Sequence, residues 1–370
     1  MKPHPTLLDR SPHELFRSAR SWSDVVDGVG DVRLADNEFI HALAVGSTIP
    51  VADALKERGL TGLREIHARD TLSLFSYRRR FGRKDQHQVS GEFLTVRRDD
   101  GPISLIVYAG APSFLREALN PLLDRVYPKV ARPFLTQQEL HDLLRTVQKA
   151  VQPDQLRIQE YSAKRRLRSP ARRRFESVRD WTDVEADAAF REAKERNVWF
   201  RSVRFEIVRS DVPGPWAGMH GRLSKYGHVS VDSGFDLVNR VVLPQLVRVT
   251  SERLKLFSNR DRVSAPHHNL MPLEVTYDRA VLERPDDLKR LLDGLKRFPH
   301  GTCTVLHANP YLHVALVDNR DFSAADVWVL SENRILIVPQ LRASYAALKR
   351  LVNHIFENFA EGRVGEPKTA

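Results

Sequence analysis

The chain has 370 residues, of which 42% are hydrophobic and 28% are charged, enough apolar material for two or three ordinary domains. Its 58 Lys and Arg residues outnumber its 47 Asp and Glu residues, so the formal net charge of +11 favours an anionic partner. The single cysteine, Cys303, excludes an intramolecular disulfide framework and a thiolate-rich metal site. No signal peptide or membrane-spanning stretch stands out, so we expect a cytoplasmic protein without membrane partners.

Residues 1–70 are expected to form a helical N-terminal segment. Ser11–Glu14 has the spacing of a capping box with proline at the first helical position, and Val51–Gly59 has helical apolar spacing. Leu63 and Ile66 predict another short helix. The order helix, glycine break, helix also admits a helix-turn-helix, with an all-helical cap on the core as the alternative.

Residues 71–150 are expected to be the first mixed unit. From Thr71 the apolar pattern changes to a period of two, and Ile103–Tyr108 is a nearly continuous apolar run typical of a strand buried on both faces. A helix is expected from Ser113, and a second begins at the capping box Thr136–Glu139.

Two further units are expected, at residues 151–262 and 263–370. In each, a strand precedes a helix, more strands follow, and a long helix closes the unit. The predicted fold class is therefore α+β, with repeated β-α-β-β-β-α units that form antiparallel sheets backed by helices.

Internal duplication is suggested most directly by two helical segments, Ser113–Val126 and Asp236–Val249. When the two are aligned, Pro121 coincides with Pro244, together with a leucine, an arginine and a valine. A proline inside a helix costs about 3 kcal/mol unless a local distortion accommodates it, so two prolines at one offset are informative.

The positive charge lies in the middle of the chain. Residues 51–300 carry a net charge of +13, while residues 1–50 carry −2 and residues 301–370 carry zero. Two arginine-rich runs stand out there, each after a predicted strand. The residues we predict to contact nucleic acid are Arg78, Arg79, Arg80, Arg83, Lys84, Lys164, Arg165, Arg166, Arg168, Arg172, Arg173 and Arg174.

Arginine-rich runs suit phosphate, because the planar guanidinium donates two parallel hydrogen bonds and can stack on a base. Tyr77, Phe81 and Phe175 beside the runs would add stacking. An acidic protein or a solvated surface would explain the same charge, so both interpretations stay open. No helix face gathers base-edge readers, so low sequence specificity is expected.

An enzymatic alternative depends on His228-Val-Ser230 and His313-Val-Ala315. Paired strands of this kind resemble those of two-histidine phosphoesterases, a resemblance that implies acid–base chemistry on RNA at His228 and His313. Ala315 departs from the pattern because it lacks the hydroxyl. A nuclease or RNA phosphoesterase is therefore the second hypothesis, and an assembly subunit that docks an acidic protein is the third.

Other chemistry finds little support in the sequence. His267 and His268 have no ligand partner at a recognisable spacing, so we expect no metal site. Phosphate-binding loops of the Gly-x-x-x-x-Gly-Lys-Ser/Thr and Gly-x-Gly-x-x-Gly types do not occur, and neither does a serine nucleophile elbow. We therefore expect no cofactor and favour a non-catalytic nucleic-acid-binding protein, with DNA or RNA as its partner.

Overall fold

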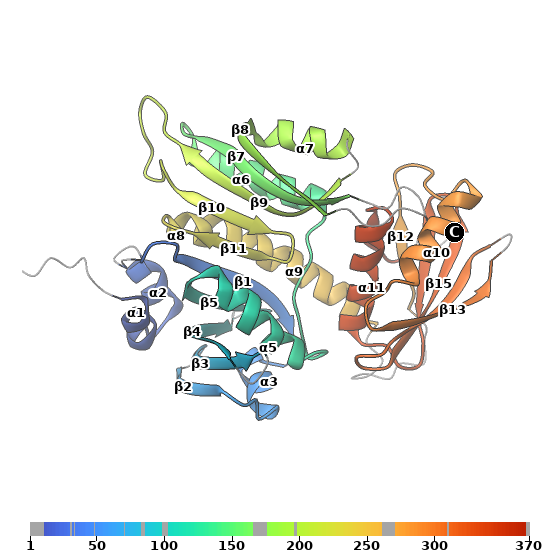
Figure 1. Cartoon of the computed structure of the whole chain (residues 1–370), viewed down its shortest axis with the longest axis horizontal. Helices are drawn as coiled ribbons and strands as arrows, with labels where there is room; N and C mark the ends of the chain where they lie inside the picture. Colours follow the sequence, from blue (N-terminus) through green and yellow to red (C-terminus); the bar gives the residue numbers. More distant parts are fainter. Residues whose placement is uncertain are drawn as a thin grey trace, which may run out of the picture. The chain divides into compact units, whose positions relative to one another are not determined.

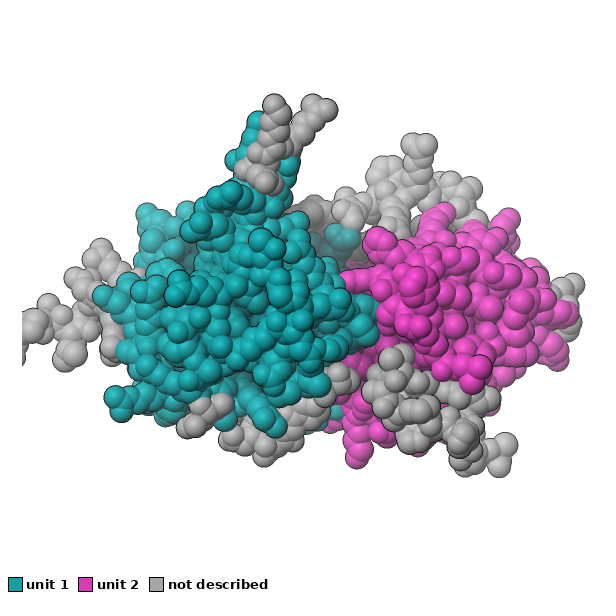
Figure 2. Space-filling view, turned by 90° about the horizontal axis from the view of Figure 1, so that it is seen from below, with its two compact units in different colours: residues 1–162, 178–192, 200–251 teal, residues 163–177, 193–199, 252–370 magenta. Residues whose placement is uncertain are grey.

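The computed structural model divides the chain into two compact units (Figure 2). Unit 1 comprises residues 1–162, 178–192 and 200–251, and unit 2 comprises residues 163–177, 193–199 and 252–370. The structure describes residues 11–29, 32, 34–47, 49–69, 71–82, 86–97, 103–165, 176–195, 198–260, 271–308 and 311–367.

One large antiparallel sheet dominates unit 1 (Figure 1). Its strands lie in the order β2-β3-β4-β5-β1-β11-β10-β9-β7-β8, and β6 also pairs with β1. The strands are β1 (Phe39–Ser47), β2 (Leu63–Arg69), β3 (Leu72–Phe81), β4 (His87–Arg97), β5 (Ile103–Gly110), β6 (Val130–Ala131), β7 (Gln155–Arg165), β8 (Glu176–Glu185), β9 (Val198–Val208), β10 (His220–Ser224) and β11 (His228–Val231).

Helices occur before, between and after these strands. They are α1 (Pro12–Ser18), α2 (Trp22–Val29), α3 (Val51–Glu57), α4 (Pro112–Phe114), η2 (Leu115–Leu119), α5 (Asn120–Arg125), α6 (Gln137–Val151), α7 (Ala186–Glu195), α8 (Phe235–Leu237), η3 (Val238–Val242) and α9 (Leu243–Ser258). The capping boxes at Ser11 and Thr136 are both formed, which confirms the two predicted helix starts.

The first half of the large sheet is covered closely on one face by α3 and the α4–η2–α5 segment. Leu43, Phe75 and Phe93 on the strands pack there with Leu55 and Leu122 from the helices. The two strands β1 and β5 are buried on both faces and have almost no exposed positions. This two-sided burial is what the continuous apolar run at Ile103–Tyr108 predicts.

Both proline-containing helices distort in the same way. The π-helical turn η2 ends two residues before Pro121, and the π-helical turn η3 ends two residues before Pro244. A widened turn accommodates a residue that has no N–H to donate. The equal offset gives the two segments one local structure, while the duplication of whole units stays a prediction.

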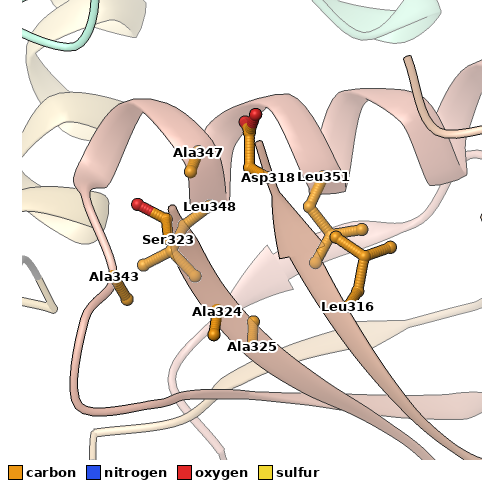
Figure 3. Close-up of a pocket in the computed structure, with 9 residues that line it drawn as sticks. All are labelled: Leu316, Asp318, Ser323, Ala324, Ala325, Ala343, Ala347, Leu348 and Leu351. Atoms are coloured by element: carbon orange, nitrogen blue, oxygen red, sulfur yellow. The ribbon is translucent and has the colours of Figure 1, made fainter. Parts of the chain in front are cut away.

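Unit 2 contains a six-stranded antiparallel sheet in the order β13-β14-β15-β16-β12-β17. Its strands are β12 (Leu273–Thr276), β13 (Gly301–His307), β14 (His313–Asp318), β15 (Ser323–Ser331), β16 (Arg334–Pro339) and β17 (Arg363–Gly365), and its helices are α10 (Pro285–Leu295) and α11 (Tyr345–Asn358). Burial alternates strictly along β14 and β16, so one sheet face is packed and the other is half-exposed. Leu348 and Leu351 of α11 lie over Leu316 on the packed face (Figure 3).

The α+β class is confirmed as a mixture of helices and antiparallel sheets, but the helical N-terminal segment is wrong in two places. Phe39–Ser47 forms the central strand β1, whose alanines disguise its two-sided burial. Leu63 and Ile66 lie on the strand β2, which pairs with β3, so the helix-turn-helix is excluded. Tertiary pairing overrides local helical spacing at both places. The four-part division of the chain stays a prediction.

Candidate nucleic-acid interface

The first arginine run lies at the end of β3. Arg78 and Arg80 are exposed, while Arg79 between them is half-buried. Because side chains alternate along a strand, Arg78 and Arg80 share one sheet face and Arg79 lies on the other. The three consecutive arginines therefore lie on the two opposite faces of the sheet. Arg83 and Lys84 lie outside the described residues.

A third arginine joins the face of Arg78 and Arg80. Arg64 on β2 pairs in register with Ser76, two residues before Arg78, and its side chain is exposed. Even-numbered residues from Ser76 to Arg80 face the same way, so Arg64, Arg78 and Arg80 lie on one face, hereafter the arginine face. Arg64 is not among the residues predicted from the sequence, because only the pairing of β2 with β3 places it on this face.

The start of β2 is held against the end of β3 at Gly62. The Arg78 N–H donates to the Gly62 carbonyl oxygen at 2.9 Å, and Gly62 has a φ of 84°. A Cβ there would lie 2.2 Å from the Arg78 carbonyl oxygen, so only glycine permits this approach. The position of the arginine face thus depends on a specific backbone geometry.

Glu92 is the acidic residue on this face among the described positions next to the three arginines, and helix α1 already neutralises it. Glu92 on β4 pairs in register with Ser76 and accepts hydrogen bonds from Arg17 and from His13, the latter at 3.1 Å. The Glu92 carboxylate raises the pKa of the Arg17 guanidinium. Among the described residues, no carboxylate forms an ion pair with Arg64, Arg78 or Arg80. The face therefore keeps its positive charge.

Arg79, on the opposite face of β3, contacts other parts of the protein. Its guanidinium donates to the carbonyl oxygen of Glu117 in η2 and lies 5.2 Å from the centre of the Phe81 ring. A π-helical turn leaves carbonyl oxygens that need a donor, and Arg79 supplies one. The structure thus gives Arg79 an internal partner that the sequence did not suggest.

The second arginine run remains an expectation from the sequence. Lys164 and Arg165 are the last two residues of β7, and nothing is described of their side chains. The others, namely Arg166, Arg168, Arg172, Arg173 and Arg174, lie outside the described residues.

His228, named in the phosphoesterase hypothesis, belongs to a pair of imidazoles inside the large sheet. His41 Nδ1 lies 3.0 Å from His228 Nε2, and His41 Nε2 lies 3.0 Å from the carbonyl oxygen of Gly110. A carbonyl only accepts, so His41 donates through Nε2 and accepts at Nδ1 from the Nε2–H of His228. His41 is fully buried and stacks on Tyr108, with ring centres 4.2 Å apart.

Both imidazoles are held neutral. Burial lowers the pKa of His41 to about 4, although its hydrogen bond to Gly110 raises it in part. Burial is the main cause that holds the pKa of His228 well below its ordinary value, and the charge of Arg222 lowers it further. The hydrogen bonds of the two imidazoles link β1 to β11 and to Gly110 at the end of β5.

His313 belongs to unit 2 and has other partners. Its ring stacks on Trp328 with centres 3.6 Å apart, and its Nε2 lies 3.5 Å from an Asp326 oxygen. Each histidine of the proposed catalytic pair is thus explained by neighbours within its own unit.

Across the described ranges, no group of three or more His, Cys, Asp or Glu side chains is arranged to hold a metal ion, and His267 and His268 lie outside those ranges. A pocket between β14, β15 and α11 encloses about 10 Å³, room for one water molecule (Figure 3). Within the described part, no helix combines the length and apolar composition needed to cross a bilayer.

Comparison with known proteins adds little to this picture. No family model matches the chain, and no curated protein matches it. Among solved structures, the di-domain ARO/CYC StfQ from the steffimycin biosynthetic pathway shares 11% identity over 61% of this chain and 91% of that chain, with a TM-score of 0.14. At that score the likeness assigns neither fold nor function.

Proposed function

We propose that this chain is a cytoplasmic, non-catalytic protein that binds the phosphate backbone of nucleic acid through the arginine face of β2 and β3. The observation that carries the proposal is the exposure of Arg64, Arg78 and Arg80 on one sheet face, beside an acid that α1 already neutralises. Guanidinium groups bind phosphate oxygens through charge-assisted hydrogen bonds, the strongest kind available to a surface side chain.

The spacing of these arginines suits a polyanion. Side chains two residues apart on a strand are separated by about 6.6–6.8 Å, close to twice the 3.4 Å of helix axis between successive phosphates of a DNA strand. Contacts of this type position a protein on a backbone without reading bases, so low sequence specificity is expected. The run at residues 164–174 enters the proposal as a second phosphate contact.

Fluorescence anisotropy with labelled single- and double-stranded DNA and RNA tests the proposal. The variant R64Q/R78Q/R80Q removes three positive charges from the arginine face. The matched control R58Q/R191Q/R209Q removes three from exposed positions on other parts of unit 1. We expect binding to weaken at least about tenfold in the first variant and less than about twofold in the control.

Equal affinities of the two variants would contradict the proposal, because they would show that only total charge matters. Wild-type protein with no measurable affinity would also contradict it and would favour an acidic protein as the partner. A further variant with Arg165, Arg166, Arg168, Arg172, Arg173 and Arg174 changed to glutamine measures the contribution of the second run. Incubation of the same nucleic acids with Mg²⁺, and separately with EDTA, should leave them uncut.

A further inference from the structure

The two sheets have four edge strands between them, and these strands differ in the number of charged residues that they carry. The strands at the ends of the large sheet are β2 and β8, and those at the ends of the small sheet are β13 and β17. β2 carries Arg64, Glu65 and Arg69, β8 carries five charged residues, and the three-residue β17 carries Arg363. β13, Gly-Thr-Cys-Thr-Val-Leu-His, has no Lys, Arg, Asp or Glu.

Edge strands present unpaired backbone N–H and C=O groups, and proteins commonly protect them with charges, bulges or short length. β13 is seven residues long and pairs with β14 in regular register from Gly301 to Val305. Its single register shift falls near its end, between Val305 and His307. β13 is thus a long edge without the electrostatic protection that the other three strands have.

β13 is also apolar and exposed. Val305 is 36% exposed and Leu306 is 54% exposed. Seven of the ten exposed large apolar side chains in the described part of the chain lie between residues 305 and 341. The seven are Val305, Leu306, Tyr311, Phe322, Trp328, Leu330 and Leu341. Two of them, Val305 and Leu306, lie on β13 itself, so this edge strand carries exposed apolar side chains.

The helical layer of unit 2 stops short of this strand. Val314 and Leu316 on β14 are buried against the helices, yet their register partners Val305 and Cys303 remain partly exposed on the same sheet face. One more strand beside β13 would cover these side chains and pair the open backbone groups together.

We propose that the missing strand is β13 of a second copy of this chain, paired antiparallel about a twofold axis near Thr304. A partner strand must be extended, uncharged and partly apolar, and β13 has each of these properties itself. Because β13 has no Lys, Arg, Asp or Glu, antiparallel pairing with its own copy brings no like charges opposite each other in any register. The two small sheets then join into one of twelve strands.

Sedimentation equilibrium of the full chain in reducing buffer tests this proposal. Wild-type protein should form dimers, whereas Thr304→Lys, which places two lysines opposite each other at the axis, should weaken dimerisation at least tenfold. The control Ile66→Lys puts the same charge on an exposed apolar position of β2 and should leave the dimer unchanged. Thermal unfolding verifies that each variant is folded.

A mixture of two variants with opposite charges at position 304 tests the proposal even if one variant is less stable. Thr304→Glu should also be monomeric alone, and an equimolar mixture of Thr304→Lys with Thr304→Glu should dimerise again. A monomeric wild type at all concentrations, a dimer that persists in Thr304→Lys, or a mixture that stays monomeric would each overturn the proposal. None of these outcomes depends on nucleic-acid binding, which the arginine face of unit 1 is proposed to supply.

Discussion

The two sheets of this chain are covered to different extents. β1 and β5 in the large sheet are buried on both faces, whereas β14 and β16 in the small sheet have buried and half-exposed positions in alternation. The large sheet uses exposed arginines at one edge, while the small sheet leaves an uncharged edge and apolar side chains open. The two candidate binding regions therefore differ in surface chemistry: the arginine face of β2 and β3 is positively charged, whereas the edge strand β13 is uncharged and apolar.

The largest expected effects come from core truncations that compare neighbouring residues on one strand. In β5, Leu105→Ala and Ile106→Ala face opposite sides, and both side chains are fully buried. Each should lower the free energy of unfolding by about 2–5 kcal/mol. In β14, Leu316→Ala should cost a similar amount, while Val317→Ala on the half-exposed face should cost about 1 kcal/mol or less.

Urea unfolding followed by circular dichroism measures these differences. Equal losses for Leu316→Ala and Val317→Ala would show that the second face of the small sheet is covered. A small decrease in the free energy of unfolding for either β5 variant would contradict the burial of β5 on both faces.

A pH-dependent effect on stability is expected from His41 in the large sheet. The folded protein keeps His41 neutral with a pKa near 4, whereas an unfolded chain binds a proton below the ordinary value of 6.5. The unfolded state then holds more protons, so stability falls as the pH drops from about 6.5 to about 4, by about 3 kcal/mol in total. Above pH 6.5 this contribution is fully present.

The variant His41→Phe keeps a ring that can stack on Tyr108 but cannot titrate. The difference in unfolding free energy between wild type and variant should therefore shrink by about 3 kcal/mol between pH 7 and pH 4. A difference that does not change with pH would mean that the imidazole is accessible to protons in the folded protein.

Helix caps give the smallest effects and again compare the two units. Ser344 at the start of α11 is buried and accepts a hydrogen bond from the Ala347 N–H, and it bonds to Ser323 and Asp321. Thr136 at the start of α6 is half-buried and caps only its own helix turn. We expect Ser344→Ala to cost about 2 kcal/mol and Thr136→Ala about 1 kcal/mol, measured by urea unfolding. A larger loss for Thr136→Ala would contradict this order.

Local chemistry made several elements predictable from sequence. The capping boxes at Ser11 and Thr136 and the apolar run at Ile103–Tyr108 all depend on residues close together in the chain. Pro121 and Pro244 each follow a π-helical turn at the same offset, but the duplication that they suggested stays a prediction.

Contacts distant in the chain were not predictable. The sequence of β1 has no clear alternation of apolar and polar residues, because it is buried on both faces and contains alanines. The spacing of Leu63 and Ile66 in β2 is compatible with a helix, and only pairing with β3 makes this segment a strand. The same limit applies to the site. The arginine run at 78–80 is evident in the sequence. That Arg79 faces η2, and that Arg64 lies on the same face as Arg78 and Arg80, follows only from the contacts of β3 with η2 and β2. His41, the partner of His228, lies 187 residues away.

The salt dependence of nucleic-acid affinity tests the proposed arginine face most directly. Each phosphate contact on a duplex contributes about −0.9 to the slope of log affinity against log salt concentration. Removal of Arg64, Arg78 and Arg80 should therefore make that slope shallower by about 2.7, while removal of Arg58, Arg191 and Arg209 should leave it unchanged. Identical slopes for the two variants would show that no phosphate contacts these three arginines.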